Sequence, residues 1–566
     1  MTSPSGSSAA GQAMAGDGAA RGAGEAAAGA VVNGHGPGAS GRDAVAEPGA
    51  AGTVRAAGTV RAAGGAPARY DAGPAWARYL PPVVALAFAL YNITAPSYWR
   101  DEAATVASVR RPFGDMIRML GNVDAVHSLY YIMMWPLEHL FGAGEFVLRF
   151  PSAIAAAAAA AAAAAIGRRL ISPWAGLCAG LVLAILPVTS RYGQEARSYE
   201  MVVAMATIAS YLLVRVLGAE PGRRRKWLIG YGAAVAAAGV LNIFGLLLIP
   251  AHAVTVALRW RRGRREPGNV RLAAGWLAAV AVAVVVASPL LVLGWQQRAQ
   301  IGWLSVNTST SGIGTLFTLS GSVLVTTAVV AVIAVAIVLG IDRSDKGKGE
   351  QRYRWPWQLI ELSLPWLAVP PLILFAASVA HPVYTSRYIL MCIPALALIL
   401  GAAISTFGQI GGWVAIAAIL VAGAPAQLQV RGPAGHFDDI RAVDAVVAAH
   451  ARPGDAVLYT NPNAESFGAA YPYGLAKLRN IGISRPAIPS GTLAGSPASL
   501  AQVRARLAGV KRVWVIEINT LVSNPYLTGI NGLPVANGSP IMNGLPFAFT
   551  GEWHEHGDYV ILYTRR

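Results

Sequence analysis

The chain has 566 residues, of which 55% are hydrophobic and only 13% are charged, and its mean hydropathy is +0.47. Soluble domains average roughly 25% charged residues, so this composition excludes a soluble globular protein and indicates a polytopic membrane protein. The net charge of +17 would suggest a nucleic-acid partner in a soluble protein. In a membrane protein it indicates Lys and Arg held in cytoplasmic loops, and we predict no nucleic-acid partner. The two cysteines, Cys178 and Cys392, lie in apolar runs, which excludes a disulfide framework and a cysteine zinc site.

Residues 1–74 are dominated by Ala, Gly, Ser, Val and Arg, and they include a tandem AAGTVR repeat at 50–61. Because such a composition cannot bury a core, we predict a disordered tail. Arg69 and Arg78 precede the first apolar span, which places this tail in the cytoplasm by the positive-inside rule. No apolar segment lies near Met1, so we expect no cleavable signal peptide.

Residues 75–425 form the predicted transmembrane domain, with about eleven crossings. The apolar stretch 127–141 is too short for a spanning helix, which needs about 20 residues. A crossing there would also put the basic clusters 168–169 and 223–226 on opposite sides of the membrane. We therefore predict that 127–141 is a helix lying in the outer interface, which suits its aromatic residues. The predicted crossings are 80–96, 147–166, 174–190, 200–217, 227–241, 243–258, 272–294, 322–341, 357–379, 389–404 and 412–424.

An odd number of crossings places residues 426–566 outside the cytoplasm. Residues 438–451 have the apolar spacing of a helix, and the segments 456–459, 510–518 and 559–564 have the composition of strands. Strands that alternate with helices indicate a small extracytoplasmic α/β domain. The expected localisation is thus a multi-pass protein of the cell membrane with a cytoplasmic N-terminus.

The histidines show no metal-ligand spacing. His127 and His139 are twelve residues apart. His554 and His556 form an H-x-H pair, but a surface strand explains this pair better than a metal site. The sequence contains no P-loop and no dinucleotide-binding fingerprint. We therefore predict no metal and no other cofactor.

Three polar clusters lie at the outer ends of predicted spans, where charge is costly unless it lines a hydrated cavity or meets a partner. They are Asp101-Glu102, residues 191–200 and residues 384–388. Taken singly, they can be a solvated acid pair, an interfacial ion-pair network and a snorkelling arginine anchor. Together on one face, two acids, several cations and flanking tyrosines indicate a site for a phosphorylated, lipid-carried substrate. A carboxylate there would activate a hydroxyl group, and arginines would hold a phosphate.

Five short motifs follow one another along residues 80–400. They are Trp99–Ala103, His127–Tyr131, Glu145–Ser152, Tyr192–Tyr199 and Ser386–Tyr388. In their content and order, the chain resembles bacterial family 39-like glycosyltransferases of the GT-C superfamily, which also includes protein O-mannosyltransferases and the lipid A aminoarabinose transferase. The resemblance implies a GT-C-like helical membrane fold with juxtamembrane helices in the first outer loop. It also implies a polyprenyl-phosphate-linked sugar donor, an outer-face active site and inversion at the anomeric carbon.

Two positions depart from the family pattern. His127 is followed by Ser128, where the family often has two prolines, and Asn242-Ile243-Phe244 stands where the family often has His-Tyr. Substrate contacts at these positions are therefore expected to differ from those of the family. The run of eleven alanines at 155–165 is assigned to close helix packing rather than to chemistry.

The expected reaction is sugar transfer from a polyprenyl-phosphate donor to an extracytoplasmic acceptor, which is a cell-envelope glycan, a lipid or a protein. Asp101 would deprotonate the acceptor hydroxyl group, and Glu102 would assist it or orient the acceptor. Arg387, Arg191 and Tyr384 would bind the donor phosphate. The further residues expected to contact substrate are His127, Tyr131, Glu195, Arg197 and Tyr388.

Two other classes of protein stay open from the sequence. One is a lipid-linked glycan transporter or flippase, although transporters often have inverted repeats and charges at mid-depth, whereas this chain has charges at helix mouths and shows no repeat. The other is a non-catalytic cell-wall binding protein whose outer domain does the work. A separation of Asp101 from Arg387 beyond the reach of one bound substrate would favour these two classes.

Overall fold

The computed structural model describes most of the chain beyond residue 73, and its described residues lie in one compact unit. The predicted disordered tail, residues 1–74, lies outside the described residues apart from Pro74, as do parts of the basic loops that follow Arg262 and Lys346. The described ranges are 74–262, 268–301, 312–346, 357–381, 383–459, 462–518, 542, 545–556 and 558–566.

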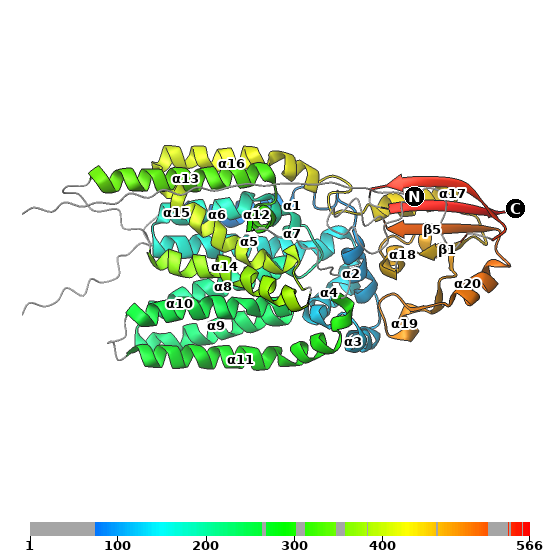
Figure 1. Cartoon of the computed structure of the whole chain (residues 1–566), viewed down its shortest axis with the longest axis horizontal. Coiled ribbons are helices and arrows are strands. Elements are labelled where there is room, and N and C mark those ends of the chain that lie inside the picture. Colours follow the sequence, from blue (N-terminus) through cyan, green and yellow to red (C-terminus); the bar gives the residue numbers. More distant parts are fainter. Residues whose placement is uncertain are drawn as a thin grey trace, which may run out of the picture. The chain divides into compact units, whose positions relative to one another are not determined.

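Apolar helices build the membrane region, and the longer of them run side by side (Figure 1). Three short 3-10 segments, η2 (Ile243–Leu247), η3 (Arg298–Ile301) and η4 (Ser386–Cys392), connect to these helices. The helices are α1 (Trp76–Leu90), α5 (Glu145–Leu170), α6 (Pro173–Ile185), α7 (Pro187–Gly193), α8 (Tyr199–Leu217), α9 (Pro221–Leu241), α10 (Leu248–Arg262), α11 (Gly268–Gln296), α12 (Gly312–Ser320), α13 (Val323–Lys346), α14 (Trp357–Ala380), α15 (Ile393–Ser405) and α16 (Gly408–Val430).

Seven of the described helices are long and apolar enough to cross a membrane, and two bent pairs raise this number to nine. The pair α6–α7 bends by 61° and the pair α12–α13 by 99°. The first bend falls at Pro187, which lacks the N–H that would continue the helix. Helices α1 and α9 occupy the other two predicted crossings, but α1 has only 15 residues and α9 carries four cations near its start. The multi-pass membrane protein is confirmed, and the count of eleven crossings stays a prediction.

The segment between α1 and α5 contains short helices, as the resemblance implied. They are α2 (Arg100–Val109), α3 (Phe113–Asn122), η1 (Ala125–His127) and α4 (Ser128–Phe141). With 14 residues, α4 is too short to span the bilayer, so the prediction of a non-spanning helix at 127–141 is confirmed. Helix α2 has Asp101 and Glu102 in its first turn, where negative charge is favoured by the helix dipole.

Small residues bring α5 close to α6. Buried alanines recur along the polyalanine run of α5, which contacts α1, α6 and α8. A Cβ atom added to Gly176 would lie 2.4 Å from the carbonyl oxygen of Ala164, and one added to Gly167 would lie 2.7 Å from the Cα atom of Gly176. The packing role predicted for the alanines thus agrees with a close approach that larger side chains would prevent.

The C-terminal region folds as the predicted α/β domain. Its main sheet has the strand order β2-β1-β5-β7-β6, in which β1 pairs in parallel with β2 and β5, and β7 pairs antiparallel with β5 and β6. The helix and the three strands predicted from spacing correspond to α17, β1, β5 and β7. The elements are β1 (Ala456–Tyr459), β2 (Arg479–Asn480), β3 (Ile483–Arg485), β4 (Ser496–Pro497), β5 (Arg512–Ile518), β6 (Phe547–Glu555), β7 (Asp558–Arg565), α17 (Ile440–His450), α18 (Phe467–Ala470), α19 (Ala487–Ser490) and α20 (Leu500–Leu507), with short turns η5 (Pro462–Ser466) and η6 (Leu475–Lys477).

Polar contacts join this domain to the segment before α2 and to the start of α5. The hydroxyl group of Tyr471 accepts a hydrogen bond from the backbone N–H of Tyr98 (2.9 Å) and donates one to Glu145 Oε1 (2.7 Å). Arg441 forms an ion pair with the same Glu145 oxygen at 2.7 Å. The α/β domain therefore packs next to the loop that carries Asp101.

Candidate active site

Asp101 and Arg387 form an ion pair, although 286 residues separate them in sequence. Asp101 lies in the first turn of α2 and Arg387 in η4. Their side chains are 22% and 23% exposed, so a substrate can reach both. The Arg387 guanidinium carbon also lies 5.0 Å from the centre of the Trp99 ring. Two of the three polar clusters seen in the sequence thus meet at one point.

The electrostatic surroundings keep Asp101 ionised. Burial by itself raises the pKa of this carboxyl group, but the nearby guanidinium groups of Arg387, Arg197 and Arg100 outweigh burial and lower the pKa below its ordinary value. Asp101 is therefore a carboxylate at neutral pH. It gains basicity when one of these cations moves away, because each of them stabilises the charged form.

Glu102 is adjacent to Asp101 in sequence but has different surroundings. Its side chain is fully buried, and Arg149 donates two hydrogen bonds to it, from Nε (2.8 Å) and Nη2 (2.7 Å). The backbone N–H of Ala196 donates a third at 2.7 Å, and His436 Nδ1 lies 3.4 Å from Glu102 Oε2. Burial raises the pKa of Glu102, but Arg149 outweighs it, so the pKa lies well below its usual range. These contacts leave Glu102 out of reach of a substrate.

Arg149 received no role from the sequence. Besides Glu102, it donates to the backbone carbonyl oxygens of Ile93 and Pro96 (both 2.8 Å) and Ser97 (3.0 Å), which lie just before α2. All five of its N–H groups are thus satisfied. An arginine inside an apolar helix is costly unless it is paired. The position of Arg149 within the apolar helix α5 was therefore the sequence signal that could have identified its role.

Arg197, His127 and Tyr131 form a second cluster near Asp101. Arg197 Nη1 donates to the Tyr131 hydroxyl group (2.8 Å), and Arg197 Nη2 lies 2.9 Å from His127 Nε2. The Tyr131 hydroxyl group in turn donates to Asp124, which has a left-handed backbone (φ 61°). The sequence-based prediction had not included Asp124.

His127 is neutral in this cluster. Burial, followed by the charge of Arg197, lowers the pKa of His127 to about 4. Because Arg197 donates to Nε2, we assign the ring proton to Nδ1. This buried Nδ1 atom has no hydrogen-bond partner among the described residues. His127 therefore offers an unused donor close to Asp101, whose charge acts on it.

Arg191 and Glu195 lie on the other side of Trp99. Glu195 accepts hydrogen bonds from Trp99 Nε1 (3.1 Å) and Arg191 Nη1 (3.0 Å). Burial raises the pKa of Glu195 to about 7 despite the opposing charge of Arg191. The Arg191 guanidinium carbon is 5.5 Å from the centres of both the Trp99 and the Tyr192 rings, within the range of cation–π attraction.

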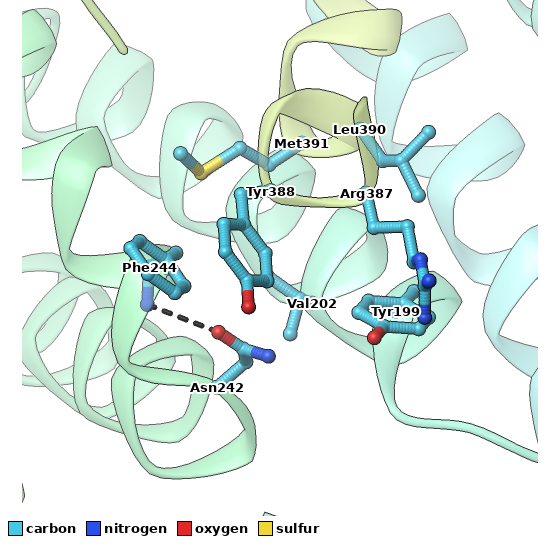
Figure 2. A pocket seen from close by; sticks show the side chains of 9 residues that line it. Tyr199, Val202, Asn242, Phe244, Arg387, Tyr388, Leu390 and Met391 are labelled. Atoms are coloured by element: carbon cyan, nitrogen blue, oxygen red, sulfur yellow. Dashed lines mark hydrogen bonds between the residues drawn. The ribbon is translucent and has the colours of Figure 1, made fainter. Parts of the chain in front are cut away.

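A pocket with an empty volume of about 230 Å³ opens beside Arg387. Figure 2 shows the Tyr388 ring facing Phe244 and the Arg387 side chain reaching down to Tyr199. The Phe244 and Tyr388 rings stack with centres 3.7 Å apart, and the backbone N–H of Phe244 donates to Asn242 Oδ1 (3.1 Å). The segment that departs from the family pattern thus lines the pocket. The lining residues are Tyr199, Val202, Asn242, Phe244, Gly245, Arg387, Tyr388, Leu390 and Met391.

Tyr384 makes contacts away from the Arg387 guanidinium group. Its hydroxyl group lies 3.3 Å from Thr315 Oγ1, and its buried ring stacks on Phe375 with centres 4.5 Å apart. Its backbone N–H donates to Ser378 Oγ at 2.9 Å. These contacts connect η4 to α12 and α14, and they engage the hydroxyl group that was expected to face the donor phosphate.

No group of three or more His, Cys, Asp or Glu side chains in the described part of the chain is arranged to hold a metal ion. His554, one half of the H-x-H pair, is 63% exposed and lies 3.0 Å from Glu552.

Comparisons with known proteins bear on the fold of the chain. Residues 128–295 match the family model described as dolichyl-phosphate-mannose-protein mannosyltransferase. The fold is similar to that of ArnT from Cupriavidus metallidurans in the apo state, with 13% identity, a TM-score of 0.55, and coverage of 85% of this chain and 97% of that chain. The same protein bound to undecaprenyl phosphate matches with 12% identity and a TM-score of 0.53 over the same shares of the two chains. No curated protein sequence matches the chain closely enough to count as a relative.

The class of fold follows from these matches: the chain has the GT-C fold that the five motifs implied. Among solved proteins it is similar to ArnT over most of its length. The resemblance stated from the sequence is therefore confirmed.

Proposed function

We propose that the chain transfers a sugar from a polyprenyl-phosphate donor to a hydroxyl group of an acceptor at the outer face of the cell membrane. The observation that carries this proposal is the contact between Asp101 and Arg387, which brings a base and a phosphate-binding cation within reach of one substrate. The match to a mannosyltransferase family model supports a sugar-transfer reaction. The undecaprenyl phosphate bound to ArnT, which has a similar fold, supports a polyprenyl-phosphate donor.

In the proposed reaction, Asp101 removes the proton of the acceptor hydroxyl group as its oxygen forms a bond to the anomeric carbon of the donor. The bond between this carbon and the phosphate oxygen breaks, and the polyprenyl phosphate leaves with the electron pair. Attack from the face opposite to the leaving group inverts the anomeric carbon. Asp101 then releases the proton to water. Arg387 stabilises the phosphate most strongly as its charge increases.

Arg387 has two partners in this scheme, and they exclude each other. In the structure it pairs with Asp101; with a donor bound, its guanidinium group binds the phosphate through two parallel hydrogen bonds. Release from Arg387 raises the pKa of Asp101 and makes it a better base. Binding of the donor phosphate thus activates the base.

The surrounding residues have supporting roles. His127 contacts the sugar through its free Nδ1–H. Tyr388, which lines the pocket, also contacts the sugar. Arg197, Tyr131 and Glu195 complete the polar lining, and Arg191 adds positive charge for the phosphate. Glu102 acts as a positioning residue through its pair with Arg149 rather than as a second acid. Tyr384 is not included in the phosphate site, because its hydroxyl group contacts Thr315.

The purified protein in liposomes, supplied with radiolabelled decaprenyl-phospho-mannose or decaprenyl-phospho-arabinose and a cell-envelope extract, tests the proposal. We expect label to move from the lipid to an acceptor in the extract. Movement of the intact donor between leaflets without breakage of its sugar–phosphate bond would instead identify a flippase. Binding without transfer or movement would identify a non-catalytic protein.

A further inference from the structure

The segment between α16 and α17 is fastened to the two residues that flank Asp101. On one side, Arg100 donates to Asp438 from its backbone N–H (2.9 Å) and from its guanidinium group (2.9 and 2.6 Å). On the other side, His436 Nδ1 lies 3.4 Å from Glu102 Oε2. His436 and Asp438 are both fully buried. The residue between them, Phe437, is therefore held next to the first turn of α2.

Phe437 has an unusual backbone and an open ring. Its φ of 90° lies in the left-handed region, which a bulky side chain adopts only when its surroundings enforce it. Its side chain is 47% exposed. The turn before it is tight, because a Cβ atom added to Gly435 would lie 2.1 Å from the carbonyl oxygen of Val430. A strained backbone that exposes an aromatic ring is typical of ligand sites rather than of packing.

The ring belongs to the surroundings of the candidate site. Its centre is 5.2 Å from that of the Trp99 ring, with planes at 57°, and 5.2 Å from the guanidinium carbon of Arg191. Trp99 also contacts Arg387, the partner of Asp101. The Trp99 side chain thus lies between Phe437 and the residues proposed to carry out transfer.

The chemistry around Phe437 favours one class of acceptor. The open ring offers an apolar face with negative charge density, on which the C–H groups of a sugar ring can pack. The Arg191 guanidinium group places a charged hydrogen-bond donor next to the ring. A lipid chain would require an extended apolar groove, whereas the Arg100–Asp438 ion pair and the polar Glu102–His436 contact flank Phe437.

We propose that Phe437 is the stacking platform for the acceptor and that the acceptor is a saccharide. This inference rests on the proposed function and specifies its acceptor. The strained segment between α16 and α17 presents the ring, and the pairs Arg100–Asp438 and Glu102–His436 fix its position relative to Asp101.

The substitution Phe437→Gly tests the inference, because glycine accepts a positive φ without strain and removes the ring. The acceptor probes are methyl glycosides of mannose and arabinose trisaccharides, compared with a serine- and threonine-rich peptide. We expect transfer to a saccharide with a KM for the acceptor that rises about tenfold in the variant, in line with the loss of a ring contact. The kcat at saturating acceptor and the binding of decaprenyl phosphate should be unchanged. Phe437→Trp should restore the KM.

Phe549→Ala is the matched control, since Phe549 is a similarly exposed aromatic residue on β6 (53%) and should leave the KM unchanged. A purely structural role for Phe437 predicts altered thermal unfolding of Phe437→Gly with an unchanged KM, which would overturn the inference. Transfer to the peptide alone would also overturn it while leaving the proposed function in place. Failure of the wild-type protein to transfer to any acceptor would contradict the proposed function and the inference together.

Discussion

The adjacent carboxylates of Asp101 and Glu102 have different surroundings because their side chains project from α2 in different directions. Consecutive residues of a helix point about 100° apart, so Asp101 faces Arg387 and remains partly exposed, whereas Glu102 faces the bundle and pairs with Arg149. Under the proposed function, the carboxylate of Asp101 is the reactive base and that of Glu102 is a fixed support. The two carboxylates differ in the partners around each side chain, and this difference determines the role proposed for each.

Substitution of Arg387 distinguishes a phosphate ligand from a membrane anchor. Lysine offers a point charge in place of the two parallel hydrogen bonds of a guanidinium group. We expect Arg387→Lys to lose much of the transfer rate and Arg387→Ala to lose about 10²–10³-fold, as when an electrostatic donor is removed from other active sites. Transfer of labelled sugar is measured at equal membrane abundance. A fully active Arg387→Lys protein would show that the arginine is an anchor.

Substitution of Glu102 tests its supporting role. Glu102→Gln leaves the buried Arg149 without its counter-charge, and loss of one member of a buried pair costs about 3–5 kcal/mol. We expect a markedly lower unfolding temperature in detergent, accompanied by lower transfer. The control is Glu138→Gln, because Glu138 pairs at 3.7 Å with the more exposed Arg110 and such pairs contribute little. A stable but inactive Glu102→Gln protein would indicate a direct catalytic role.

At the scale of elements, the site consists of segments that the membrane bundle alone does not hold together. Helix α2 bears Asp101, η4 bears Arg387, the turn after α7 bears Glu195 and Arg197, and the segment before α17 bears Phe437. The contacts of Arg100 with Asp438 and of Glu102 with His436 bring the first and last of these together. These contacts place the segment after α16 next to the candidate site.

The buried His436 makes this connection sensitive to acid. Burial, followed by the charge of Arg191, lowers the pKa of His436 to about 3 from an ordinary value of 6.5. Between these values the unfolded chain binds a proton that the folded protein does not, so stability falls as the pH falls from 6.5 towards 3. We expect the unfolding temperature of His436→Gln to depend less on pH in this window than that of the wild type. Identical slopes would contradict a buried neutral histidine at this position.

At the scale of the whole molecule, periodicity and charge predicted the architecture well. Apolar stretches located the spanning helices, and the requirement that all basic loops lie on one side identified α4 as non-spanning. The α/β domain followed from the helical spacing of residues 438–451 and from the strand-like composition of three segments within residues 426–566. These signals are local, so one sequence suffices to detect them.

The site was less predictable because its contacts are distant in sequence. The charged clusters at helix mouths were visible, but the partners of Glu102 lie 47 and 334 residues away. The exposed, strained ring of Phe437 depends on a turn geometry that its sequence, Gly435-His436-Phe437-Asp438, does not specify by periodicity. The contacts of the Tyr384 side chain with Thr315 and Phe375 are likewise not visible from its position three residues before Arg387.

The predicted topology is a property of the whole chain and can be tested as such. In a variant without Cys178 and Cys392, a cysteine at exposed Ser484 of the α/β domain should react with an impermeant thiol reagent added to whole cells. A cysteine at Asp345, near the end of α13, should be protected until the cells are opened. The reverse pattern would place the site on the cytoplasmic face.

The central claim, that Asp101 and Arg387 together form the transfer centre, is tested most directly with Asp101→Asn in liposomes that contain labelled donor. The variant retains the shape of the side chain but removes the charge that pairs with Arg387. Because Arg387 is then free to bind phosphate, decaprenyl phosphate should bind at least as tightly as to the wild type. Transfer should fall about 10²–10⁴-fold, since the general base is lost. Wild-type transfer by Asp101→Asn, or loss of donor binding together with transfer, would contradict the claim.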